Sequence, residues 1–159
     1  MSIEEVEETF EDPVSKFVTS GSLEPCKSKF FSGDIISFMD ELRTGRFRIY
    51  FTQYKYIHDY QNCPNFILDN LNRGFVQQLD DKRKYLFAGF KCVKNNDTYH
   101  IFGIWICNCM VPMENVVSDK YDDFEWEELD VNIPAHVEKL LRTLSREPST
   151  NVISLKYLH

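Results

Sequence analysis

The sequence of 159 residues lacks any apolar run long enough to cross a membrane. Its longest candidate, Ile101 to Cys107, is far shorter than the roughly 20 residues that a membrane-spanning helix needs. The start of the chain, MSIEEVEETFED, carries neither the basic nor the apolar region of a signal peptide. We therefore expect no membrane association and a location in the cytoplasm or nucleus.

Residue patterns that build catalytic and cofactor sites are also missing. The six glycines are scattered, and no glycine-rich phosphate loop occurs. The four histidines lie far apart and form no motif such as HExxH. We predict no catalytic residue, no cofactor and no small-molecule substrate. A nucleophile and base made of Cys63 and a remote histidine stays open as an alternative.

The cysteines do not have the spacing of a metal site. They are odd in number, and no pair resembles a zinc knuckle. Cys107 and Cys109 would share one face of a strand, but no pair of histidines lies nearby. This pattern favours free thiols in a reducing compartment, and we predict no metal site. The five are Cys26, Cys63, Cys92, Cys107 and Cys109.

The charge is unevenly distributed along the chain. The net charge is −7, from 18 basic and 25 acidic residues, and six of the acids precede the first base, Lys16. Without these six, 19 acids face 18 bases, so the remainder is nearly neutral. Such a body lacks the basic field of a free nucleic-acid binder. We interpret residues 1–11 as a solubilising acidic tail, with a docking segment for a basic partner as the alternative.

What is present is the composition of a globular domain, with 43% hydrophobic and 14% aromatic residues. Apolar spacing predicts helices over about 33–43, from Pro64 to about Leu79, and from Pro134 to Leu144. Gly74 within the second helix suggests close approach to another backbone. Alternation predicts a strand over 46–56 and a hairpin of strands 85–93 and 99–107, joined at Asn95-Asn96-Asp97.

The second hairpin strand is apolar on both faces, so it should lie in the centre of a sheet, with Trp105 in the core. Phe124 and Trp126 indicate another short strand, whereas residues 108–117 are ambiguous. This order of elements predicts an α+β fold with an antiparallel sheet, in a single domain.

Two polar segments are candidates for binding a partner. One face of the strand over 46–56 would carry arginines and tyrosines, which pair with phosphates and stack on bases. The alternative is that a helix covers this face and the tyrosines are core. The acidic segment from Asp119 to Asp130 is either a solvated loop or a patch for a basic protein. The predicted partner-binding residues are Arg46, Arg48, Tyr50, Tyr54, Tyr56 and Arg73.

Four segments of the sequence, in this order, resemble the conserved C-terminal domain of the gamma subunit of eukaryotic elongation factor 1. They are Asp12-Pro13; the block from Asn70-Leu71 through Gly74, Gln77, Leu79-Asp80 and Arg83-Lys84 to Phe87-Ala88; Gly103-Ile104-Trp105; and Tyr121, Phe124, Trp126 and Leu129-Asp130. The resemblance implies a lens-shaped single α+β domain, in which an antiparallel sheet of about five strands is flanked by helices, and it implies no catalysis. It also implies a role beside the ribosome, because the gamma subunit is a scaffold in the complex that recharges the aminoacyl-tRNA carrier with GTP.

The chain departs from the family pattern at several positions. Phe47 and Tyr50 stand where the family has tryptophans, and Arg46 stands where it has glycine. The family's glutathione-transferase-like domain and lysine-rich linker have no counterpart in this sequence. Met1 leads us to expect a complete gene product, with an excised domain as the alternative. We divide the chain into an acidic tail (1–11), the elongation factor 1-gamma-like domain (12–147) and a C-terminal tail (148–159) that orders on binding.

Three functions follow as hypotheses. The first is a non-enzymatic protein that docks on the ribosome, through rRNA and ribosomal proteins, and regulates or silences translation in resting cells. The second is a structural subunit or fragment of the elongation factor 1 complex, bound to the other subunits. The third, from another class, is a thiol-dependent enzyme.

Overall fold

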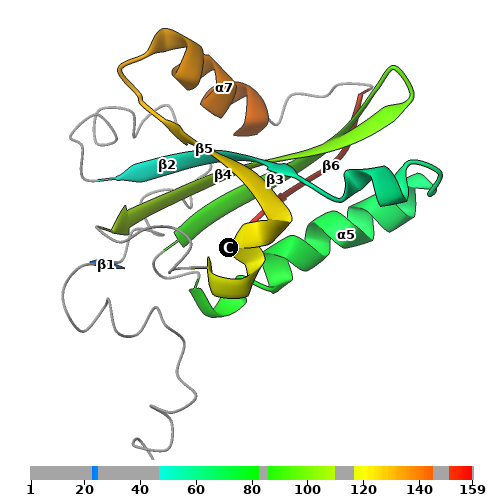
Figure 1. The fold of residues 1–159 in the computed structure, drawn as a ribbon, viewed down its shortest axis with the longest axis horizontal. Coiled ribbons are helices and arrows are strands. Elements are labelled where there is room, and N and C mark those ends of the chain that lie inside the picture. The colour runs from blue at the N-terminus through cyan, green and yellow to red at the C-terminus, as the bar shows by residue number, and fades with distance from the viewer. Residues whose placement is uncertain (1–22, 25–46, 83–85, 110–116, 145–150, 159) are drawn as a thin grey trace, which may run out of the picture.

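The computed structural model of the protein describes residues 23–24, 47–82, 86–109, 117–144 and 151–158. Within these ranges the strands form one antiparallel sheet in the order β5-β2-β4-β3-β6 (Figure 1). The strands are β2 (Arg48–Tyr54), β3 (Leu86–Asn95), β4 (Thr98–Cys109), β5 (Phe124–Leu129) and β6 (Val152–Tyr157). The short β1 (Leu23–Glu24) pairs with the end of β4.

The hairpin of β3 and β4 is the centre of the sheet, as the sequence predicts. Asn96 and Asp97 have φ values of 51° and 65°, the left-handed region that Asn and Asp tolerate better than other residues with a side chain. This two-residue turn fixes the register from Asn95 opposite Thr98 to Leu86 opposite Cys107. The apolar β4 therefore lies between β2 and β3, which confirms its predicted central place.

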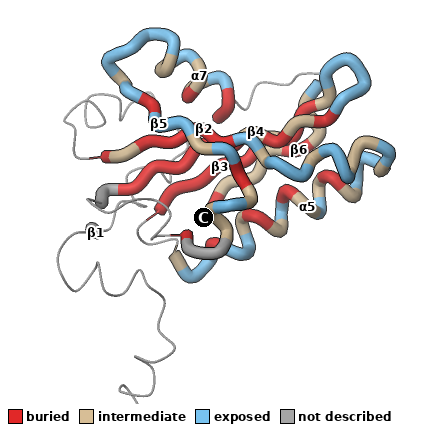
Figure 2. The backbone as a smooth tube through the Cα atoms, in the orientation of Figure 1, coloured by how far each residue is buried: buried red, intermediate tan, exposed pale blue. Residues whose placement is uncertain are grey.

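Two helices cover the two faces of the sheet (Figure 1). Helix α5 (Asn65–Gln77) lies over one face, together with a core that includes Leu68, Phe90 and Trp105. Helix α7 (Pro134–Leu144) lies over the other face, where Leu140 and Ile104 belong to a second core. Figure 2 shows that buried residues continue along the central strands between the two helices. The α+β fold with a flanked antiparallel sheet is thus confirmed.

Short 3-10 helices complete the described chain: η2 (Ile57–Tyr60), η3 (Asp80–Lys82) and η4 (Ser118–Asp123). Residues 124–129 form the short strand expected around Phe124 and Trp126. The predicted helix over 33–43, the acidic tail and Asp12-Pro13 lie outside the described residues. None of the described helices is both long and apolar enough to cross a membrane.

The C-terminal segment corrects one prediction. Residues 152–157 are not part of a tail that waits for a partner, because they form β6 and pair with β3 along the edge of the sheet. Leu158 is 2% exposed and its backbone N–H donates to the carbonyl of Ala88. The apolar residues of this segment therefore find their partner within the chain itself.

Helix α5 corrects a second prediction. A Cβ atom built on Gly74 would meet no atom within 4 Å outside the helix, so this glycine does not lie against the backbone of another described segment. The close approach of α5 to the sheet is at Asn72 instead. Its side-chain amide is buried and donates to the carbonyl of Phe90 (2.9 Å) and to the Ser154 hydroxyl (3.1 Å). One side chain thus fastens α5 to both β3 and β6.

Candidate functional site

The predicted arginine and tyrosine face is not an open surface. Because β2 has a helix-covered sheet face on each side, Tyr50 is buried in the α5 core, only 8% exposed, and meets Trp126 edge-on. Tyr54 is half-buried and packs against Phe75 and Phe124. For these two residues the structure corrects the expectation of an exposed face: the alternative, that a helix covers the face and the tyrosines are core, is what it shows.

The pKa of Tyr54 reflects this position. Burial, together with the neighbouring Tyr60, Asp123 and Asp59, raises the pKa of its hydroxyl to about 12. The phenol therefore stays neutral at physiological pH and belongs to the packing of the molecule. Only Tyr56, at 43% exposed, presents its ring to solvent among the three tyrosines predicted on this strand.

The predicted arginines are placed far apart. Arg48 faces Glu128 on β5, with 3.4 Å between the Nη2 and Oε1 atoms, and Arg73 pairs with Asp69 one turn earlier on α5 (2.8 Å). Arg46 lies outside the described residues. Both described arginines are thus held by carboxylates on different elements, so the sequence-predicted set is not one constellation. That these residues bind a partner stays a prediction.

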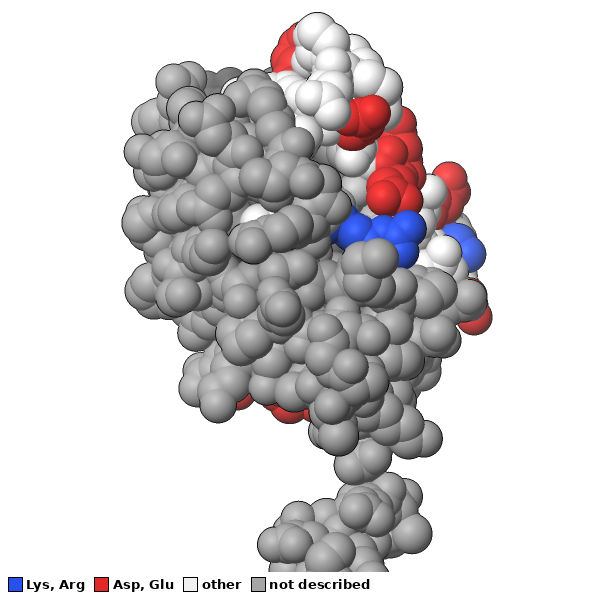
Figure 3. Space-filling view, turned by 90° about the vertical axis from the view of Figure 1, so that its left-hand side faces the viewer, with Lys and Arg blue, Asp and Glu red and all other residues white. Residues whose placement is uncertain are grey.

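The acidic segment spans η4 and β5 rather than a loop. Trp126 folds back onto Tyr121, with 4.9 Å between the ring centres and nearly parallel planes, and its indole N–H donates to the Tyr121 carbonyl. Most of the described acids of this segment are exposed. Figure 3 shows the acidic side chains as a band beside a small basic patch on this end of the molecule. The exposed acids are Asp122, Glu125, Glu127, Glu128 and Asp130.

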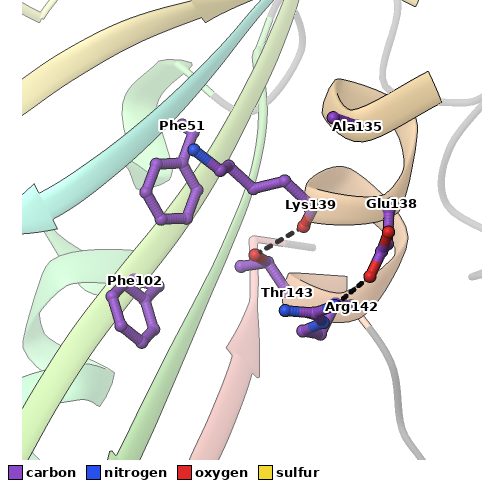
Figure 4. Close-up of a pocket in the computed structure, with 7 residues that line it drawn as sticks. All are labelled: Phe51, Phe102, Ala135, Glu138, Lys139, Arg142 and Thr143. Atoms are coloured by element: carbon purple, nitrogen blue, oxygen red, sulfur yellow. Dashed lines mark hydrogen bonds and ion pairs between the residues drawn. The ribbon is translucent and has the colours of Figure 1, made fainter. Parts of the chain in front are cut away.

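A groove on the opposite face of the sheet was not predicted from the sequence. It lies between α7 and strands β2 and β4, and its volume is about 320 Å³. Phe51 and Phe102 form the sheet side, and α7 supplies the other side, as Figure 4 shows. The α7 residues that line it are Ala135, Glu138, Lys139, Arg142 and Thr143.

Cations lie along the helix side of the groove. Lys139 extends from α7 across to Phe51, with its ammonium 4.6 Å from the ring centre, and it also pairs with Glu127 at 2.7 Å (Figure 4). Arg142 pairs with Glu138 one turn earlier. From β3, the ammonium of Lys91 donates to the backbone carbonyl of Arg142 (2.9 Å). Two basic side chains, Lys139 and Arg142, therefore line the groove, and Lys91 lies next to Arg142.

The sheet side of the groove begins a row of aromatic rings. The rings of Phe51 and Phe102 lie side by side with 5.6 Å between ring centres (Figure 4), and Phe102 stacks on His100 at 5.8 Å with planes only 7° apart. Phe102 and His100 are both half-buried. The sequence contains the signal for this row, because residues 100 and 102 alternate along one strand. The apolar face of β4 was interpreted only as core, so the row was missed.

The described residues hold no evident reactive centre. Cys92 and Cys107 are fully buried, and burial raises the pKa of the Cys92 thiol to about 12. Cys63 is half-buried and free. Within the described ranges, no group of three or more His, Cys, Asp or Glu side chains is placed to hold a metal ion. The absence of catalysis stays a prediction, since these facts concern only part of the chain.

The fold and the groove together define a class of protein. It is a small antiparallel α+β domain whose described surface carries aromatic and basic side chains suited to binding. Residues 26–110, more than half of the chain, match the family described as elongation factor 1 gamma, conserved domain. The chain therefore belongs to this family, which confirms the resemblance found in its sequence motifs. The match includes β2, α5, β3 and β4, and hence the sheet side of the groove.

The curated relatives that match this chain have low sequence identity to it. Elongation factor 1-gamma 2 of Oryza sativa subsp. japonica is 26% identical over 116 residues, which cover 72% of this chain and 27% of the relative. Probable elongation factor 1-gamma 2 of Arabidopsis thaliana is equally similar, with 28% of its length covered. Elongation factor 1-gamma of Prunus avium is 24% identical over 125 residues, 77% of this chain and 29% of the relative. The chain thus spans less than a third of the length of these relatives.

Proposed function

We propose that this protein is a non-catalytic binding module of the translation apparatus, which docks on the ribosome as a folded unit and regulates or silences translation. Membership of the elongation factor 1 gamma conserved-domain family is the observation that carries the proposal. Relatives that contain this domain are named as elongation factors. The cytoplasm is the location that this function requires.

The environment of the potential reactive groups supports a binding role. His136 accepts a hydrogen bond from the backbone N–H of Asp130, and His100 stacks on Phe102, so these histidines serve local structure and packing. The buried thiols of Cys92 and Cys107 lack the exposure that a reactive cysteine needs. Described side chains therefore offer surfaces for contact rather than a nucleophile with its base.

Only some of the residues predicted to contact the ribosome lie at the surface. Arg48, Tyr56 and Arg73 remain at the surface, while Tyr50 and Tyr54 do not. An arginine held by an exposed carboxylate can exchange it for a phosphate, because exposed ion pairs contribute only about 0–1 kcal/mol. Charge reversal of Arg46 and Arg48 is the direct test of this surface. Loss of ribosome binding with an unchanged melting temperature is expected.

A second candidate is a scaffold subunit of the elongation factor 1 complex, bound to its other subunits. The names of the curated relatives favour it, since all three described above are elongation factors 1-gamma. The acidic band on η4 and β5 would suit a basic subunit of such a complex.

Fractionation of a cell extract on a sucrose gradient separates the two candidates. The first predicts that an epitope-tagged full chain migrates with ribosomal particles and leaves them when the salt concentration is raised. The second predicts migration in a lighter complex, together with the exchange subunits. A chain that stays at the top of the gradient as a free monomer, under both resting and growing conditions, would contradict both.

A further inference from the structure

The groove beneath α7 has the size of a ligand site and lies at one end of the aromatic row. Its volume of about 320 Å³ is at the lower end of the 300–1,000 Å³ that small-ligand pockets typically have. One side is aromatic and the other is mostly polar and charged. A ligand that fills it would therefore be flat on one side and charged or polar on the other.

Phe102 stands at the centre of this arrangement. In the register of the sheet, Phe102 lies opposite Gln53 on β2 and opposite Lys91 on β3. Residues that face each other across antiparallel strands point to the same side of the sheet. The half-buried ring is therefore flanked by an exposed amide on one side and by an ammonium group on the other. A planar heterocycle stacked there has hydrogen-bonding groups within reach of its edge.

The positive charge beside Phe102 is only partly compensated. Burial lowers the pKa of Lys91, and the nearby Arg142 guanidinium lowers it further. Among the described residues no carboxylate pairs with Lys91, whereas Arg142 has Glu138. Two cations that repel each other beside a groove are stabilised by an anion between them. A phosphate group is the anion that an arginine and a lysine bind most often in this way.

We propose that the groove binds an unpaired nucleotide of RNA, with its base stacked on Phe102 and its phosphate held by Lys91 and Arg142. Proteins recognise single-stranded RNA by stacking unpaired bases on aromatic side chains of a sheet and by contacting the backbone with cations. The choice of RNA over other nucleotides rests on the proposed function. An acidic peptide would use the cations but leave the aromatic row without a role.

Fluorescence anisotropy with the full chain and a labelled single-stranded RNA of six uridines tests this proposal. The parent protein should bind saturably at low salt. Phe102→Ala should raise the Kd about tenfold, since stacking of one base contributes on the order of 1–3 kcal/mol. Arg142→Gln should weaken binding and lower the slope of log Kd against log salt concentration by about 0.7, the value for one phosphate contact on a single strand.

Control variants are available away from the groove. Lys156 on β6 pairs with Asp69 of α5 at 3.3 Å, so Lys156→Gln removes one basic side chain outside the groove and should leave the Kd unchanged. Phe66 on α5 is 64% exposed, so Phe66→Ala is the control for Phe102→Ala and should also leave the Kd unchanged. Circular dichroism checks that each variant is folded. If Phe102→Ala unfolds the protein, Lys91→Gln provides the same test through the phosphate.

Three results would overturn the proposal: no saturable binding by the parent, equal loss of affinity in Lys156→Gln and Arg142→Gln, or tighter binding of a hexaglutamate peptide than of RNA. The test is distinct from that of the proposed function. If the protein migrates with ribosomes but Phe102→Ala binds RNA like the parent, the proposed function stands and the nucleotide site in the groove is rejected.

Discussion

At the scale of single residues, Trp105 connects the central strands. Its side chain is 1% exposed, packs against Phe90 and Phe124, and donates its indole N–H to the Thr52 hydroxyl at 2.7 Å. Trp105→Ala should lower the free energy of unfolding by about 3–5 kcal/mol, the usual effect of deleting a large buried aromatic. Urea denaturation measures it. A loss of less than about 1 kcal/mol would show that Trp105 is not core.

The glycines give a prediction with opposite signs at two positions. Gly74 lies in α5 with open space around it, so Gly74→Ala should stabilise the protein by about 0.5–1 kcal/mol. Gly103→Ala should destabilise it, because the added Cβ would lie 2.6 Å from the Thr52 hydroxyl and 3.0 Å from Phe90. Thermal melts of the two variants provide the comparison. A destabilised Gly74→Ala would mean that α5 lies closer to another segment than described.

The lowered pKa of Asp69 leads to a prediction of how the stability of the protein depends on pH. Its pKa is lowered below the ordinary 3.8, chiefly by a hydrogen bond from Ser154 and then by Lys156 and Arg73. A carboxyl whose folded pKa is lowered stabilises the protein above its ordinary pKa, and the contribution is lost as the pH falls through the lowered value. Asp69→Asn should therefore reduce stability at pH 7, with a smaller difference from the parent at pH 3.

The control for this prediction is Asp122→Asn at an exposed position, which should change stability little at either pH. Urea denaturation at both pH values is the measurement. An Asp69→Asn variant whose deficit is as large at pH 3 as at pH 7 would show that the carboxylate charge is not the cause.

At the scale of elements, β6 makes the strongest prediction. A chain that ends at Thr150 loses this edge strand, and with it the Ser154 hydroxyl that Asn72 contacts and the buried Leu158. We expect it to lose more than about 4 kcal/mol, a large share of the stability of a small domain. Lys156→Gln keeps the backbone pairing of β6 and is the control. A truncated chain that melts within a few degrees of the parent would contradict the assignment.

Local patterns were sufficient to predict several elements. The hairpin of β3 and β4 follows from Asn96 and Asp97, and α7 follows from the spacing of its leucines. Elements whose environment depends on distant segments were misjudged. The alternating pattern correctly predicted that Tyr50 and Tyr54 share one face of β2. The sequence of β2 does not indicate that this face packs into the core formed with α5, which comes later in the chain. β6 was missed because its pairing partner, β3, lies about 60 residues away.

The candidate site shows the same limit. The groove combines β2, β4 and α7; residues 139 and 142 supply its cations, and residue 91 of β3 lies next to residue 142. No local motif links these positions, since only the packing of α7 across the sheet brings them together. Arg142 was an ordinary helical arginine in the sequence, and Phe102 an ordinary core residue. Partner-binding residues predicted from one strand alone could therefore not include them.

At the scale of the whole molecule, the two faces of the sheet differ in what they offer. The acidic band lies on η4 and β5, whereas the α7 face carries the aromatic row with its cations. The net charge of −7 opposes non-specific attraction to RNA, so binding to a ribosome has to come from a shaped surface. Such binding should be saturable and should weaken as salt is added.

Co-sedimentation of the purified full chain with purified ribosomes, over a series of protein and salt concentrations, tests the proposed function most directly. We predict a saturable isotherm that approaches one protein per ribosome and shifts to weaker binding at higher salt. A folded protein that stays in the supernatant at every concentration, or pellets in proportion to its concentration without saturation, would contradict the proposal that this domain docks on the ribosome.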